Sequence, residues 1–179
     1  MKRSKRIAMQ LVLTTLALII FGLELALPPL LPGVSGVRIG LYHILILYAL
    51  LTMGTSSAIW LMVITSIFGP IFAGASVLIF ETLAGGILSL ATIIVIKKLL
   101  YDKIGLIGIG VVGALMHQVG QFLIALKMTS NGAIFAYLPT MSIMAVITGT
   151  LTGLLTGAIM RMTKRIWSAP HEEESIEKR

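Results

Sequence analysis

The sequence of 179 residues contains no cysteine. This absence excludes disulfide bonds, thiolate metal sites and cysteine nucleophiles. Charged residues are scarce as well, at 12% of the chain, and Asp102 is the one aspartate, so there is no Asp-rich motif for a metal-bound diphosphate. The chain also lacks the Gly-x-x-x-x-Gly-Lys-Ser/Thr, His-Glu-x-x-His and Gly-x-Ser-x-Gly patterns of P-loops, zinc proteases and serine hydrolases. We therefore predict no catalytic residues, no metal site, no cofactor and no ATP site on this chain.

Hydrophobic residues make up 57% of the chain, and the mean hydropathy is +1.01. A soluble domain of this length needs far more polar surface, so lipid is the expected solvent. The formal net charge of +7 does not indicate nucleic-acid binding, because the basic residues flank apolar segments and do not share one face of an amphipathic helix. We interpret this charge as a topology signal.

A helix that crosses the hydrocarbon core needs about 20 apolar residues. Four segments meet this requirement: residues 7–27, 74–96, 105–126 and 139–160. The stretch 39–73 is too long for one helix, and a polar break at 52–57 divides it, so we interpret it as a short helical hairpin whose second arm bends near Pro70. The sequence thus predicts an all-α bundle of six transmembrane helices in one domain, residues 1–165, followed by a short polar cytoplasmic tail, residues 166–179.

The basic residues in the short loops predict the orientation of the bundle. Only Arg38 and Lys127 lie on one side of the predicted membrane. The other twelve lie on the opposite side: Lys2, Arg3, Lys5, Arg6, Lys97, Lys98, Lys103, Arg161, Lys164, Arg165, Lys178 and Arg179. This excess places both termini in the cytoplasm. We expect the bundle to lie in a bacterial plasma membrane.

The basic start followed by an apolar run also fits a secretory signal peptide. We favour a retained first helix, because the run is longer than the apolar core of a typical signal peptide. The residues at 25–28, Leu-Ala-Leu-Pro, also make a poor cleavage site.

Several polar side chains fall inside the apolar segments, where a charge near the bilayer centre costs about 2.5–3.5 kcal/mol on insertion scales. At about 1.5 Å of rise per residue, most of them lie at one level in the outer half of the membrane. A shared layer of this kind suggests a cavity that receives a solute from outside. The candidate substrate-binding residues are Glu24, Arg38, His43, Glu81, His117, Gln118 and Gln121.

Helical spacing gives these residues inward-facing neighbours, because side chains four apart share a face and lipid offers polar groups no partner. Three stripes result: Gln10, Thr14, Ala17 and Glu24; Glu81, Gly85, Ser89 and Thr92; and Gly113, His117 and Gln121. An alternative for His117 and Gln121 is hydrogen bonding between helices without any ligand. Glu81 could likewise pair with Arg38 or Lys127, and Glu24 and Arg38 could be solvated at the membrane interface.

Three glycines in the last apolar segment, Gly149, Gly153 and Gly157, recur at intervals of four residues. Small residues at this spacing allow two helix backbones to approach closely. Two interpretations follow, namely packing within the chain's own bundle or docking of a partner membrane subunit.

Four segments resemble the Gx transporter family, which also carries the name heptaprenyl diphosphate synthase component I. They are PGVSGVRIGLYHI at 32–44, LAGGILSL at 83–90, GALMHQVGQFL at 113–123 and YLP at 137–139. The segments occur in the same order over nearly all of residues 5–160, and His117 with Gly120 and Gln121 is their most specific part. The chain departs from the family with Met116-His117-Gln118 in place of Ala-His-Asn, and with His43 in place of Asn.

The family is similar to the substrate-binding S components of energy-coupling factor (ECF) transporters. That resemblance implies a six-helix membrane protein that binds vitamins or other micronutrients from outside and works with a transmembrane coupling subunit and paired ATPases. His117, Gln121 and Glu81 would then hold polar groups of the solute. The Ala-x-x-x-Ala pattern often seen in the first helix of S components is absent, since Ala8 is followed by Val12.

Two other functions fit the sequence. The older family name suggests a membrane component that assists polyprenyl diphosphate synthesis, with catalysis in a partner. A purely structural membrane subunit is the third possibility, and the polar layer would then only join helices.

Overall fold

The computed structural model describes residues 3–26, 40–100, 103–129 and 132–168, and this part of the chain is helical with no strands. The α-helices and two short 3-10 helices follow one another as α1 (Arg3–Ala26), α2 (His43–Thr52), α3 (Thr55–Phe72), η1 (Ser76–Leu78), α4 (Ile79–Leu100), α5 (Leu106–Thr129), η2 (Gly132–Tyr137) and α6 (Leu138–Ser168). The predicted site residue Arg38 and the tail beyond Ser168 lie outside the described residues.

Five of these helices, all except α2, are long and apolar enough to cross a membrane. The chain is therefore a multi-pass membrane protein. The sixth predicted span corresponds to α2, whose 10 residues cover roughly 15 Å, about half of a hydrocarbon core. The described part of the chain thus supports five full spans and one short, almost entirely buried helix.

The break between α2 and α3 lies where the sequence predicts it, within residues 52–57. Helix α2 ends as Met53 N–H donates to Ala49, and Gly54 then adopts a φ of 96° before α3 begins at Thr55. Only glycine reaches this φ without strain. Pro70 lies in the last turn of α3, and the helix ends two residues later at Phe72.

Two basic side chains, from α1 and α4, form hydrogen bonds with backbone carbonyls at the C-terminal end of α2. Arg6 of α1 donates to the carbonyl of Met53 at 2.9 Å and to Ser57 Oγ at 3.3 Å. Lys97 of α4 donates to the carbonyl of Leu50 at 3.0 Å. The last carbonyls of a helix lack partners within it and carry partial negative charge, so these bonds satisfy them.

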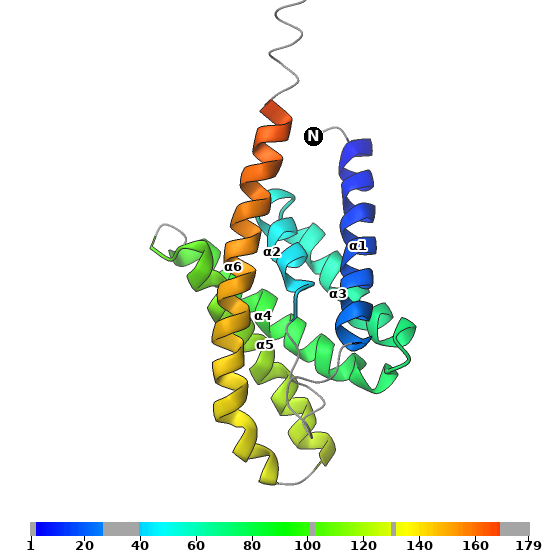
Figure 1. Cartoon of the computed structure of the whole chain (residues 1–179), viewed down its shortest axis with the longest axis vertical. Coiled ribbons are helices and arrows are strands. Elements are labelled where there is room, and N and C mark those ends of the chain that lie inside the picture. Colours follow the sequence, from blue (N-terminus) through cyan, green and yellow to red (C-terminus); the bar gives the residue numbers. More distant parts are fainter. Residues whose placement is uncertain (1–2, 27–39, 101–102, 130–131, 169–179) are drawn as a thin grey trace, which may run out of the picture.

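Figure 1 shows α6 and α1 on opposite flanks of the molecule, with α2 between them. The start of α1 and the end of α6 lie at the same end of the molecule (Figure 1), as expected if both face one side of the membrane. The most extensive helix contacts are those of α5 with α4 and with α6, while α1 packs mainly on α3.

The glycines of α6 pack inside the chain. A Cβ added at Gly149 would lie 2.5 Å from Val111 Cα, and one at Gly153 would lie 2.5 Å from the Leu106 carbonyl oxygen. Gly157 is less closely packed, since an added Cβ would lie 3.2 Å from a side-chain carbon of Leu106. The backbone of α5 thus lies against Gly149 and Gly153, whereas docking of a partner subunit through Gly149, Gly153 and Gly157 stays a prediction.

Candidate functional site

All six helices, together with the short segment before α2, surround one cavity in the interior of the bundle. Its volume is about 60 Å³. Since a water molecule needs about 10–15 Å³ of such space, the cavity has room for roughly four to six waters or a small polar group. The lining residues are Phe21, Gly40, Tyr42, His43, Ile46, Leu47, Leu50, Met62, Thr82, Gly86, Ser89, Leu90, Ile93, Gly110, Gly113, Ala114, His117, Gln118, Gln121, Thr148 and Thr152.

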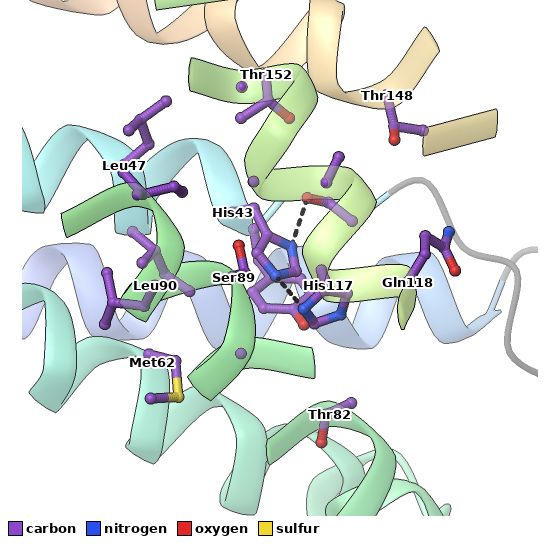
Figure 2. Close-up of a pocket in the computed structure, with 18 of the residues that line it drawn as sticks. His43, Leu47, Met62, Thr82, Ser89, Leu90, His117, Gln118, Thr148 and Thr152 are labelled. Atoms are coloured by element: carbon purple, nitrogen blue, oxygen red, sulfur yellow. Dashed lines mark hydrogen bonds between the residues drawn. The ribbon is translucent and has the colours of Figure 1, made fainter. Parts of the chain in front are cut away.

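Two histidines from different helices meet in this cavity. His43 Nε2 on α2 lies 3.0 Å from His117 Nδ1 on α5, and the ring centroids are 4.1 Å apart in an edge-to-face arrangement. His43 Nδ1 lies 3.1 Å from the carbonyl oxygen of Gly40. Figure 2 shows both contacts as dashed lines.

These contacts fix which nitrogens carry protons when both rings are neutral. The Gly40 carbonyl can only accept, so His43 Nδ1 carries the hydrogen and His43 Nε2 is an acceptor. In that tautomer His117 donates through its Nδ1, and its ring is also hydrogen-bonded to the backbone of Gly85.

Gly85 on α4 sets the position of the His117 ring. A Cβ at Gly85 would lie 2.7 Å from His117 Cε1 and 2.8 Å from His117 Nδ1. The neighbouring contact is equally close, since a Cβ at Gly120 would lie 2.6 Å from the Ala84 carbonyl oxygen. Two glycines therefore bring α4 and α5 close enough for the imidazole to pack against the α4 backbone.

Helix α5 contributes three polar side chains to the cavity. His117, Gln118 and Gln121 are all buried, at 7–8% exposure. Gln118 Oε1 is fully buried and has no hydrogen-bond partner. Buried acceptors are rarely left unpaired in folded proteins, so this oxygen indicates a missing partner.

The opposite wall is apolar. It consists of Leu47, Leu50, Met62, Leu90 and Ile93 from α2, α3 and α4. Figure 2 shows Leu47, Leu90 and Met62 on one side of the histidine pair and Gln118 on the other. An apolar enclosure with a few convergent polar groups is the usual character of a small-molecule site.

Of the residues predicted from the sequence, the structure brings His43, His117, Gln118 and Gln121 together around the cavity. The two buried carboxylates, Glu24 and Glu81, do not line it. Glu24 instead accepts a hydrogen bond from the backbone N–H of Leu41, next to the segment that closes the cavity. Glu81 lies in the first turn of α4, where the helix dipole favours negative charge.

Some cavity residues were not singled out from the sequence. Tyr42, Thr82, Thr148 and Thr152 line the cavity, and the two last ones stand one residue before Gly149 and Gly153 in α6. The spacing of four residues between Thr148 and Thr152 indicates that they share one face of α6. The sequence does not indicate which helix packs against that face.

The described residues contain no cluster of three or more His, Cys, Asp or Glu side chains that could hold a metal ion. The histidine pair contains only two such side chains, and one ring nitrogen of each is hydrogen-bonded to the other ring.

The chain matches the family model of heptaprenyl diphosphate synthase component I over residues 13–159. No curated protein and no solved structure is significantly similar to it. The match covers the five long helices in part or whole and the whole of the cavity lining. The chain therefore belongs to the heptaprenyl diphosphate synthase component I family.

Proposed function

We propose that this protein is the membrane-embedded substrate-binding subunit of a transporter, similar to the S components of ECF transporters. It would capture a small external micronutrient, such as a vitamin, and pass it inward with the help of a transmembrane coupling subunit and ATPase subunits. The observation that carries this proposal is the enclosed cavity, which combines a wall of buried polar side chains with an apolar wall. A bundle held together only by helix packing has no need of a buried, unpaired amide oxygen.

The proposed binding residues are the four that line the cavity, His43, His117, Gln118 and Gln121. Glu24 supports the site indirectly, by holding the backbone at Leu41. The cavity of about 60 Å³ is smaller than the pockets that hold whole drug-sized ligands, which are about 300–1,000 Å³. A vitamin-sized solute would therefore enter with movement of the surrounding helices.

Energy for inward movement would come from partners, because the sequence has no P-loop. In this proposal the protein itself catalyses no reaction. Its contribution is selective binding within the membrane.

Ligand binding by the purified protein tests this function. We expect a small molecule to copurify with the full chain and His117→Ala to weaken its binding about tenfold or more, because a polar contact and the His43 bond are both lost. Leu123→Ala is the matched control, since Leu123 lies on the same helix but is 55% exposed on the outer surface of the bundle. Identification of the molecule by mass spectrometry, followed by calorimetry, gives the affinities.

Glu81→Gln completes this comparison. Glu81 is buried but lies outside the cavity lining, so we expect a smaller change in affinity than for His117→Ala. An unchanged affinity in His117→Ala would remove the cavity as the binding site.

The orientation of the bundle is a further part of this proposal, and the absence of cysteine makes it easy to test. We expect Lys127→Cys to react with a membrane-impermeant maleimide in intact cells, and Lys103→Cys to react only after permeabilisation. Both lysines are exposed, at opposite ends of α5. The cysteine-free parent provides the background, and the reverse labelling pattern would place the termini outside.

The family name supports a second function, in which the chain is a membrane component that assists heptaprenyl diphosphate synthesis with a catalytic partner. The purified protein would then accelerate such a synthase in a reconstituted assay. A large acceleration that survives His117→Ala would favour this function over solute capture.

A further inference from the structure

The cavity is uncharged along its described lining. None of its lining residues is Asp, Glu, Lys or Arg. The nearby carboxylate of Glu24 is engaged by the Leu41 backbone, and the cations Arg6 and Lys97 are bonded to carbonyls at the end of α2. An ion buried here would lose its hydration without gaining an opposite charge, which is strongly unfavourable.

Three oxygens of the cavity can act as acceptors toward a ligand. Gln118 Oε1 is buried and has no donor. The hydroxyl hydrogens of Thr82 and Thr148 are donated to backbone carbonyls, so their oxygens can only accept from the cavity. A ligand that satisfies this wall must bring N–H or O–H donors.

A diphosphate has the opposite character. It is an anion with acceptor oxygens, and proteins hold it with arginine, lysine, backbone N–H groups or metal ions. The described cavity lining holds neither arginine nor lysine, and the donors that it does offer are neutral amide and hydroxyl groups.

We infer that the cavity binds an uncharged group with N–H or O–H donors, such as the edge of a neutral nitrogen heterocycle, and excludes diphosphates. A donor of the ligand meets Gln118 Oε1, while the ring body packs against the apolar wall of Leu47, Leu50 and Met62. This inference rests on the proposed function and specifies the class of solute.

The test measures thermal stabilisation of the purified full chain by three sets of probes. The neutral set is uracil, hypoxanthine and nicotinamide, the anionic set is inorganic diphosphate and isopentenyl diphosphate, and the cationic probe is thiamine. We expect stabilisation by at least one neutral probe and by none of the ions. Calorimetry with that probe should then show binding about tenfold weaker in Gln118→Met, which removes the acceptor at nearly constant size.

Leu123→Met, at the exposed outer surface of the same helix, is the matched control and should bind the probe as the parent does. Stabilisation by a diphosphate or by thiamine that is lost in Gln118→Met would overturn the inference and leave solute binding intact. Equal affinity of Gln118→Met and the parent for the neutral probe would also overturn it. Stabilisation by no probe of any class would contradict both the inference and the proposed function.

Discussion

Gly85→Ala is expected to weaken ligand binding by about 30- to 100-fold and to lower the stability of the helical bundle. The added methyl would lie 2.7 Å from His117 Cε1, 2.8 Å from its Nδ1 and 2.8 Å from the His117 backbone carbonyl oxygen, closer than real contacts allow. The ring must turn away and the backbones of α4 and α5 must separate, which breaks the 3.0 Å bond to His43 and leaves buried nitrogens unpaired. Losing such a bond with both partners buried costs about 2–2.7 kcal/mol, which gives this range of affinities.

Calorimetry with the copurified ligand or the best neutral probe measures this effect, and a thermal unfolding curve reports the fold. Gly22→Ala is the control, because Gly22 has no atom within 4 Å of an added Cβ and alanine favours the helix. If Gly85→Ala bound the ligand as well as Gly22→Ala does, the His117 ring could not be part of the site.

Hydropathy and spacing were enough to predict most of the helices. The predicted spans 7–27 and 105–126 correspond to α1 and α5 within a few residues. The length of α2 was not predictable, because a ten-residue helix buried among others has the same apolar composition as half of a full span. Helix α2 is followed by Gly54, which adopts a φ of 96°. The backbone angle of a single glycine cannot be predicted from the sequence.

The cavity was predictable only in part, for a similar reason. His117 and Gln121 share a helix face by their spacing, which is a local property of α5. The partner of His117 is His43, 74 residues away in the chain, and one sequence carries no sign of that pairing. Depth in the membrane grouped Glu24 and Glu81 with the histidines, yet neither carboxylate lines the cavity.

For the glycines of α6, too, the sequence predicts a helix face but not the helix that packs against it. Their spacing predicted a close helix approach, but it could not tell a partner subunit from a neighbouring helix of the same chain. In the structure, the backbone of α5 lies against Gly149 and Gly153.

Gly153→Ala is therefore expected to destabilise the bundle by about 2–4 kcal/mol, whereas Gly157→Ala should change its stability by less than about 0.5 kcal/mol. At Gly153 the new methyl would meet the Leu106 carbonyl oxygen at 2.5 Å and Ile107 Cα at 2.6 Å. These atoms belong to the α5 backbone, so relief requires α5 and α6 to separate. At Gly157 the nearest atom is Leu106 Cδ1 at 3.2 Å, the end of a flexible side chain, and a small rotation removes the overlap.

Unfolding of the two variants in detergent measures the difference within one motif, on one helix and with the same substitution. The comparison also distinguishes packing inside the bundle from docking of a partner subunit. If the motif were a docking surface, the substitutions would weaken assembly with the partner and leave the stability of the isolated chain unchanged. Equal stability of Gly153→Ala and Gly157→Ala would show that α5 and α6 do not approach as closely as described. Loss of stability at Gly153 alone identifies the motif as the internal contact that holds α5, and with it His117, against the rest of the cavity.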